Sequence, residues 1–288
     1  LVRFATVMNA RKNAAGRCGM GAVMGSKNLK AVTAAGDVPL EIADRPALTA
    51  LKKELTQYLH ASKIIKIYGK VGTALLYEPA NKLGALRTKN SQLNQWSPKL
   101  NASELDQHIE RMTACSECTV HCRHVNKYGG EGPDFVSFAL LGANCGIEDL
   151  AEIIKLNNLC NDLGIDTSSA GTLIPWAMEL YQRGIIGDEL TGGPIAWGDI
   201  KRVRQLVVDI SERKGFGDVL ADSSQAVSLG KLPPEAADYL MAVKNLPQSD
   251  PHDPRYIKSF ALGIAVSSRG ADHLRNRPTL DILRLSED

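Results

Sequence analysis

The stretch E-D-L-A-E-I-I-K-L-N-N-L-C-N-D-L-G-I-D-T-S-S, residues 148–169, decides the predicted fold. Its apolar residues recur close to every 3.6 positions, which predicts an amphipathic helix. Gly164 ends this helix and Thr167 starts the next one. Asp162 and Asp166 flank the break, so their carboxylates could face one ligand that carries ring N–H groups. A glycine C-cap followed by a threonine N-cap explains the same letters without any ligand.

Capping residues elsewhere predict further helices. Asp44, with Pro46 just inside, is typical of a helix start, and we expect that helix to run to about His60. Other predicted helices start at Ser103, run from Thr167 through Tyr181, and run from Asp199 through Arg213. Strand-favouring residues gather in the ranges 1–9 and 28–35 and are sparse after residue 40. We therefore predict a mainly α chain with a short β remnant at the N-terminus.

Composition narrows the class of protein. With 288 residues and 44% hydrophobic content, the chain can form one large or two ordinary domains. A net charge of +2 and 5% aromatic residues give no sign of a nucleic-acid partner. No stretch has the apolar length of a membrane span, and six cysteines in a chain of this size are typical of a reduced, cytoplasmic protein. Because no initiator methionine opens it, we expect the chain to be a fragment of a longer polypeptide.

Three cysteines form the run C-S-E-C-T-V-H-C, at Cys115, Cys118 and Cys122. Thiolates at this spacing can converge on one soft metal centre, and three of them leave a cubane iron–sulfur cluster one ligand short. A zinc site that recruits His121 or His124 is an alternative, and so are three cysteines without a metal. The spacing leaves these alternatives open. The remote Cys145 and Cys160 lie on apolar helix faces, which predicts buried structural thiols.

A glycine-rich loop occupies residues 14–27, with the letters A-A-G-R-C-G-M-G-A-V-M-G-S-K. It lacks the spacing of a nucleotide P-loop. Its glycines would still let backbone N–H groups approach a phosphate, with Arg17 and Lys27 supplying positive charge. A tight turn between two strands explains the composition equally well.

The stretch 267–277 gathers three arginines, an aspartate and a histidine around Gly270. A solvated surface would explain the charges alone. A solvated surface explains less well why Arg269 and Gly270 are followed by His273. This stretch is therefore a second candidate for a functional site.

Four segments, taken jointly and in order, resemble the aldehyde ferredoxin oxidoreductase family of tungsten–pterin enzymes. The first is A-A-G-R-C-G-M-G-A-V-M-G-S-K-N-L-K-A-V, and the second is the cysteine run. The third combines L-L-G-A-N-C-G-I-E-D-L with L-C-N-D-L-G-I-D-T-S-S, and the fourth is S-S-R-G-A-D-H-L-R. The resemblance covers essentially the whole chain, and the joint order is far more specific than any single motif.

The resemblance implies a fold with a β domain that bears two pterins, followed by two helical domains. Residues 1–38 would be the tail of the β domain, 39–244 the helical domain with the cluster and pterin motifs, and 245–288 the start of the second helical domain. The proline-rich stretch 246–255 would be a loop at the boundary.

The resemblance also implies an activity. Family members oxidise a small aldehyde to a carboxylic acid at a tungsten (or molybdenum) bis-pterin centre, with magnesium bridging the pterin phosphates. A 4Fe-4S cluster passes the electrons singly to ferredoxin. A homo-oligomer is compatible with this. One alternative is the reduction of an aromatic acyl-thioester by a related family member, and another is a non-catalytic helical module with a structural zinc.

Carried over by position, Cys115, Cys118 and Cys122 would ligate the cluster. His273 would stand beside the metal as a proton-transfer or substrate-orienting group. The residues implied to hold the pterin are Ala15, Gly16, Arg17, Asn161, Asp162, Gly164, Ile165, Asp166 and Arg269.

The chain departs from the family pattern at three places. No cysteine after Cys160 supplies a fourth cluster ligand. Asn161 stands where an acidic residue commonly opens the pterin motif. Val136 stands where many members carry a glutamate proposed as the active-site acid, so the acid role would shift to Glu131 or Asp134.

Overall fold

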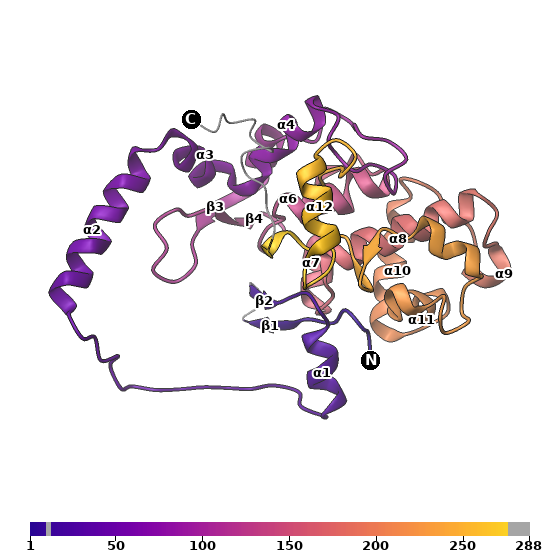
Figure 1. Ribbon diagram of the computed structural model, residues 1–288, viewed down its shortest axis with the longest axis horizontal. Helices are drawn as coiled ribbons and strands as arrows, with labels where there is room; N and C mark the ends of the chain where they lie inside the picture. Colours follow the sequence, from indigo (N-terminus) through magenta and orange to yellow (C-terminus); the bar gives the residue numbers. More distant parts are fainter. Residues whose placement is uncertain (10–12, 276–288) are drawn as a thin grey trace.

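The computed structural model describes residues 1–9 and 13–275, and it is mainly helical with a few short strands, as predicted (Figure 1). The α-helices are α1 (Met20–Ser26), α2 (Arg45–Ala61), α3 (Lys63–Val71), α4 (Tyr77–Lys82), α5 (Ala102–Gln107), α6 (Phe135–Leu141), α7 (Leu150–Asp162), α8 (Thr167–Gln182), α9 (Asp188–Thr191), α10 (Ile200–Glu212), α11 (Phe216–Ala221) and α12 (Lys258–Val266). Short 3-10 turns are η1 (Gly72–Leu76), η2 (Ala143–Cys145), η3 (Ser223–Gln225), η4 (Pro234–Tyr239) and η5 (His273–Arg275).

The strands form three separate antiparallel pairs among the described residues. They are β1 (Val7–Asn9) with β2 (Asn13–Ala15), β3 (Ile109–Thr113) with β4 (Arg123–Asn126), and β5 (Ala242–Val243) with β6 (Leu246–Pro247). In the second pair Thr113 faces Arg123, and the register shifts between Ile109 and Arg111. Two-stranded ribbons of this length depend on the helices around them for stability.

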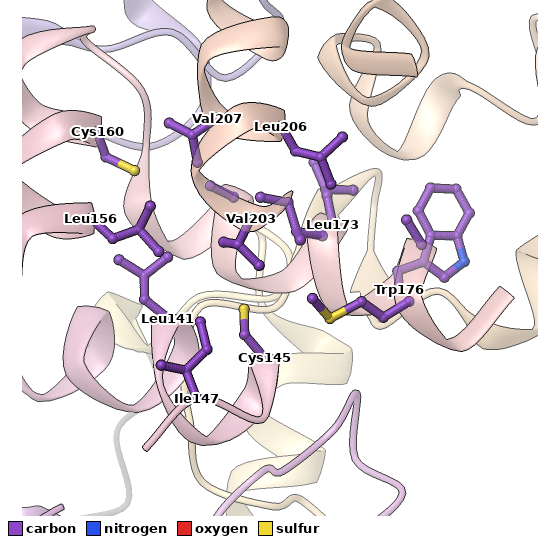
Figure 2. Packing of buried hydrophobic residues seen from close by; sticks show 14 of the residues in the cluster. Leu141, Cys145, Ile147, Leu156, Cys160, Leu173, Trp176, Val203, Leu206 and Val207 are labelled. Atoms are coloured by element: carbon purple, nitrogen blue, oxygen red, sulfur yellow. The ribbon is translucent and has the colours of Figure 1, made fainter. Parts of the chain in front are cut away.

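The hydrophobic core lies where α6, α7, α8 and α10 meet (Figure 2). The side chains labelled there are Leu141, Cys145, Ile147, Leu156, Cys160, Leu173, Trp176, Val203, Leu206 and Val207. Trp176 is fully buried, and its indole Nε1 donates a hydrogen bond to the carbonyl oxygen of Ala236 at 2.8 Å. Cys145 and Cys160 are fully buried, which confirms their predicted burial. Burial raises the pKa of Cys160 to about 12, so its reactive thiolate is scarce at neutral pH.

The caps expected at Asp44 and Asp199 are confirmed. Asp44 Oδ1 accepts a hydrogen bond from the backbone N–H of Ala47 at 2.8 Å, at the start of α2. Asp199 Oδ1 accepts one from Arg202 at 3.0 Å, at the start of α10. The periodic stretch forms α7, and Gly164 follows it with a φ of +66°, a conformation that favours glycine.

Two predicted helix starts are wrong by one or two residues. The cap of α8 is Asp166 and not Thr167, and its carboxylate accepts from two backbone N–H groups at 3.2 Å each. A carboxylate has two oxygens to offer the free N–H groups of a first turn, whereas a hydroxyl has one. The cap of α5 is Asn101 and not Ser103, because Asn101 Oδ1 accepts from Glu104 at 2.9 Å.

The second predicted strand, residues 28–35, is wrong. This segment is extended and exposed, and it leads along the outside of the molecule to α2 (Figure 1). The turn expected over residues 14–27 instead contains β2 and α1. Gly19, with a φ of +70°, lets the chain enter α1, and an added Cβ there would lie 2.2 Å from the carbonyl oxygen of Arg3.

The proline-rich stretch is a loop from residue 248 onward, as predicted, but its first two residues form β6 and the loop runs through the interior. Residues 248–250, 252 and 253 are buried. The fully buried Arg87 holds the loop by donating from Nη1 to the carbonyl oxygens of Gln248 and Asp250, at 3.1 and 3.3 Å. The domain limits at 38 and 244 stay predictions, and residues 276–288 of the last domain lie outside the described residues.

Helix α2 lies away from the hydrophobic core (Figure 1), and none of its residues is buried. None of the helices in the described part of the chain is both long and apolar enough to cross a bilayer.

Candidate functional site

The N-terminal segment pairs with the break between α7 and α8. The backbone N–H of Thr6 donates to the carbonyl oxygen of Gly164 at 2.8 Å, and the N–H of Asp166 donates to the carbonyl oxygen of Phe4 at 3.3 Å. Ala5 and Ile165 form an antiparallel bridge between these bonds. Residues 4–6 and the helix break, which are remote in sequence, therefore lie against each other.

Arg17 connects three segments at this junction. Its Nε lies 3.5 Å from Asp166 Oδ2, and its Nη1 lies 3.6 Å from Asp272 Oδ2. It also donates to the carbonyl oxygens of Ala271, at 3.3 Å, and of Pro247. The Arg17 side chain is only 10% exposed, so its charge is balanced by carboxylates rather than by water.

A cavity of about 230 Å³ opens beside Arg17. The predicted site residues that line it are Gly16, Arg17, Asn161, Ile165, Asp166 and His273. Val136, Asp134 and Asp272 contribute to the same wall. The structure thus brings together residues from the glycine loop, the helix break and the C-terminal stretch.

His273 is held by a carboxylate that sequence reasoning missed. Its Nδ1 lies 3.3 Å from Asp250 Oδ2, while His252 Nδ1 lies 2.5 Å from the other oxygen, Asp250 Oδ1. Burial disfavours the charged form of Asp250, but His252 and His273 outweigh burial and hold the pKa of Asp250 below its usual value. With Nδ1 of His273 turned to Asp250, its Nε2 is the ring nitrogen left for a ligand.

The cysteine run forms the loop between β3 and β4. The backbone N–H of Cys118 donates to the carbonyl oxygen of Cys115 at 3.1 Å, and Glu117 and His121 have φ of +61° and +56°. Burial, followed by the nearby Cys118, raises the pKa of the Cys122 thiol. Bound metal cations would reverse that shift by favouring thiolates.

Neither the cluster nor the zinc alternative has a ligand set already assembled. Within residues 1–9 and 13–275, no three His, Cys, Asp or Glu side chains are arranged to hold one metal ion. Cys115 and His121 are exposed, whereas His124 is buried and burial lowers its pKa.

A second cavity, of about 410 Å³, lies on the side of the cysteines. Cys115 and Cys122 line it, and so do Arg123 and Glu131, whose side chains form an ion pair at 2.7 Å. The residues common to both cavities are Ala14, Asp134, Asn161 and Thr167. The cysteine side and the His273 side therefore adjoin across a shared wall.

Some predicted site residues lie elsewhere. Glu131 lines the cysteine-side cavity and not that of His273, whereas Asp134 lines both. Asp162 and Ala15 are exposed. Arg269 lies 3.4 Å from Asp272 and lines a third cavity. The carboxylates of Asp162 and Asp166 have different roles, because that of Asp166 caps α8.

The residues missed from sequence are Arg87, Asp250 and His252, whereas Asp272 was recognised only as the aspartate of the stretch 267–277. One signal was available for Asp250 and His252: the letters S-D-P-H-D-P-R place three ionisable side chains within four positions of a loop. We interpreted that loop as a boundary because of its prolines. Arg87 lies in an ordinary stretch of sequence that gives no hint of its burial.

Comparison with known proteins identifies the family. Residues 50–284 match the family described as "Aldehyde ferredoxin oxidoreductase, domains 2 & 3", and residues 1–36 match "Aldehyde ferredoxin oxidoreductase, N-terminal domain". The chain belongs to the aldehyde ferredoxin oxidoreductase family. The recognition of this family from the four sequence segments is therefore confirmed.

Similar members of the aldehyde ferredoxin oxidoreductase family include two named "Tungsten-containing aldehyde ferredoxin oxidoreductase". The one from Pyrococcus furiosus is 37% identical over 286 residues, and the one from Thermococcus kodakarensis is 36% identical over 291. Each match covers 96% of this chain and 47% of the relative. "Aliphatic sulfonate oxidoreductase, WOR-like subunit" of P. furiosus is 32% identical, over 94% of this chain and 46% of the relative. The chain spans about half the length of these relatives.

A solved structure shares the fold. It is the active site complex BamBC of benzoyl coenzyme A reductase in complex with 1,5-dienoyl-CoA, with a TM-score of 0.70 and 22% identity. The match covers 86% of this chain and 41% of that chain. At this identity the likeness supports the aldehyde ferredoxin oxidoreductase type of fold and carries nothing about the reaction.

The donor groups around the His273 cavity fit a pterin of the kind that aldehyde ferredoxin oxidoreductases imply. Arg17 Nε and Asp272 Oδ2 are buried there without a hydrogen-bond partner among the described residues. A buried donor and a buried acceptor left in this state favour a polar ligand that satisfies both. Three thiols on one loop are likewise a donor set suited to an iron–sulfur cluster. Magnesium, and tungsten against molybdenum, stay predictions.

Proposed function

We propose that the protein to which this chain belongs oxidises an aldehyde to a carboxylic acid and passes the electrons to ferredoxin. One aldehyde and one water give one carboxylic acid, two protons and two electrons. The electrons leave singly, so two ferredoxin molecules are reduced in each turnover.

The arrangement of the two adjoining cavities carries this proposal. One contains His273 with the residues expected to hold a pterin, and the other contains Cys115 and Cys122. Asp134 and Asn161 belong to the wall between them. A reaction that produces electrons in one place and exports them from another needs two sites this close, with little solvent between them.

The chain's own residues have distinct roles in this proposal. Arg17 and Asp272 would offer a donor and an acceptor to the pterin, with Asp166 holding Arg17 in place. Cys115, Cys118 and Cys122 would hold the cluster. When bound, the tungsten–pterin centre supplies two-electron redox chemistry, and the cluster supplies one-electron transfer. The other residues around the His273 cavity would transfer protons and orient the substrate.

His273 would handle a proton during aldehyde oxidation. Its Nδ1 lies 3.3 Å from Asp250 Oδ2, so a proton on Nδ1 would face the carboxylate and leave Nε2 free to accept one. A carboxylate behind an imidazole fixes its tautomer and stabilises the imidazolium that forms when Nε2 takes a proton. Asp134, which lines the same cavity, would take the acid role before Glu131 does.

A second candidate reaction is the reduction of an aromatic acyl-thioester. The observation in its favour is Val136, an apolar side chain in the wall of the His273 cavity where many family members carry a glutamate. An apolar wall suits an aromatic ring better than it suits the proton transfers of aldehyde oxidation.

The test uses the full-length parent protein, purified without oxygen. Aldehyde oxidation predicts tungsten with about four irons per subunit, and reduction of a viologen dye when an aldehyde is added. Zinc as the sole metal would overturn the proposal and favour the structural module. Both expected metals together with oxidation of a dienoyl-thioester, and no turnover of any aldehyde, would favour the second reaction.

A further inference from the structure

The two helices before the cysteine loop carry an unusual concentration of positive charge. Between residues 45 and 71 the chain has six basic residues against the single acidic Glu54, a surplus of five positive charges, whereas the whole chain has a net charge of +2. The basic residues are Arg45, Lys52, Lys53, Lys63, Lys66 and Lys70. The rest of the chain is therefore acidic overall, and the positive charge is local to α2 and α3.

The same helices expose apolar side chains next to these charges. Leu48, Leu51, Leu55 and Tyr58 follow one another along α2 at helical spacing and are 48, 50, 50 and 77% exposed. No residue of α2 or α3 is buried, and Figure 1 shows α2 standing clear of the core. An apolar stripe with a charged surround is typical of a protein-binding surface and not of a purely solvated helix.

This basic face, meaning the exposed side chains of α2 and α3, touches the cysteine loop directly. Lys52 forms an ion pair with Glu117, and His60 Nε2 lies 3.0 Å from the carbonyl oxygen of Thr119. A Cβ added to Gly69 of α3 would lie 3.3 Å from the carbonyl oxygen of Val120 in the same loop. A groove of about 590 Å³ lies between the two parts, and Cys118 forms part of its lining.

We propose that the basic face of α2 and α3 is the docking surface for an acidic ferredoxin. This rests on the proposed function, which requires a one-electron carrier to approach the cluster held by Cys115, Cys118 and Cys122. An acidic carrier is steered by the surplus positive charge and seated by the apolar stripe. A carrier that must bind and leave at every electron needs only a small interface.

The experiment uses the full-length enzyme with an acidic ferredoxin. The variant combines Lys53→Glu, Lys63→Glu and Lys70→Glu, none of which lines the groove or the two cavities. The matched control combines Lys99→Glu, Lys201→Glu and Lys214→Glu, which are exposed lysines outside α2 and α3. The variant and the control each replace three positive charges by negative ones, so an effect of net charge alone would weaken ferredoxin binding equally in the two proteins.

Two measurements are made on each protein: the KM for ferredoxin in aldehyde-driven reduction, and ferredoxin binding by surface plasmon resonance. In about 50 mM salt the variant should weaken both by about tenfold or more, and the difference should shrink in about 500 mM salt, where charges are screened. The control should stay within about twofold of the wild type. Reduction of an electrically neutral sulfonated viologen should be unchanged in both.

Several results would overturn the docking proposal. They are an unchanged KM and affinity in the variant, an equal loss in the control, and an equal loss with the neutral dye. A changed molecular mass of the variant in solution would also overturn it, because the face would then join copies of the chain. If the wild type reduces neither acceptor, the proposed function fails, and the binding measurement alone then decides whether the face docks ferredoxin.

Discussion

Arg17 Nε lies 3.5 Å from Asp166 Oδ2, so the arginine of the glycine-rich loop meets the carboxylate that caps α8. The same guanidinium reaches Asp272, one residue before His273. A single cation thus sets the spacing between the helix break and the C-terminal stretch. The cavity between them owes its shape to this contact.

Arg17→Ala should lower the free energy of unfolding by about 2–3 kcal/mol, because Asp166 and Asp272 lose the cation that they share, although Asp272 keeps Arg269 at 3.4 Å. Arg17→Lys should recover part of the loss, since an ammonium keeps the charge but not the planar fork. Urea unfolding followed by circular dichroism measures both. Lys27→Ala, at an exposed lysine just after α1, should cost under about 0.5 kcal/mol. An Arg17→Ala variant as stable as Lys27→Ala would show that the contact contributes nothing.

Asp250 should make stability depend on pH. Its pKa is lower in the folded protein than in the unfolded chain, so its contribution is present above about pH 4 and is lost as the pH falls through the folded value. Asp250→Asn should therefore be less stable than the wild type at pH 7 and lose less stability on acidification. Unfolding in urea at pH 7, 5 and 3.5 measures this. Ser249→Ala keeps the charge and should retain the wild-type pH dependence; equal slopes in all three proteins would contradict the assignment.

His273→Ala should reduce turnover of the full-length enzyme by about 10²–10⁴-fold, the usual contribution of a positioned acid–base group. Its tungsten content should stay near that of the wild type, because Arg17 and Asp272, the residues proposed to hold the pterin, are unchanged. Steady-state kinetics and elemental analysis on the same preparation separate the two effects. Unchanged turnover would demote His273 to a packing residue.

Cys118→Ser should abolish aldehyde-driven dye reduction and lower the iron content, while tungsten is retained. A serine oxygen is a harder and weaker ligand than a thiolate for a cluster iron. Cys18→Ser, at an exposed cysteine away from the run, is the matched control and should leave iron and dye reduction intact. Full iron and full activity in Cys118→Ser would refute the ligand assignment.

Gly72→Ala should loosen the cysteine loop. The alanine would combine a φ of +63° with a Cβ 2.5 Å from the carbonyl oxygen of Cys122. Gly184→Ala has a similar φ, +70°, with open space around the Cβ, so it isolates the backbone strain, at about 1 kcal/mol. Gly72→Ala should cost about 1–3 kcal/mol more than Gly184→Ala in thermal or urea unfolding. Equal costs would mean that the loop moves aside freely.

The parts of the structure that sequence predicted are those set by local chemistry. Asp44 and Asp199 cap their helices, and Gly164 breaks the chain between α7 and α8, because each needs only its near neighbours. Residues 28–35 have strand-favouring side chains but find no partner strand, since pairing is decided by distant segments. The cysteine run lies in the loop of a hairpin formed by β3 and β4, and this pairing has no local signal in the sequence.

The sequence predicts the separate motifs of the candidate site but not how they are arranged around one cavity. Arg17, Asp166 and His273 could be named from sequence, and the structure places all three around one cavity. Asp250 could not be named from sequence, because its role depends on its contact with His273, which lies in the turn after α12. Glu131 shows the converse: a plausible acid in sequence, it faces the cysteine side.

The extended segment between α1 and α2 leaves Val32, Val38 and Leu40 more than three-quarters exposed. A protease has ready access to such a segment. The backbone pairing of residues 4–6 with 164–166, together with Arg17, would still hold the severed N-terminal piece in place. Cleavage near residue 35 should therefore leave a non-covalent complex of two fragments. The two fragments should elute together in size-exclusion chromatography and separate only when the protein is denatured.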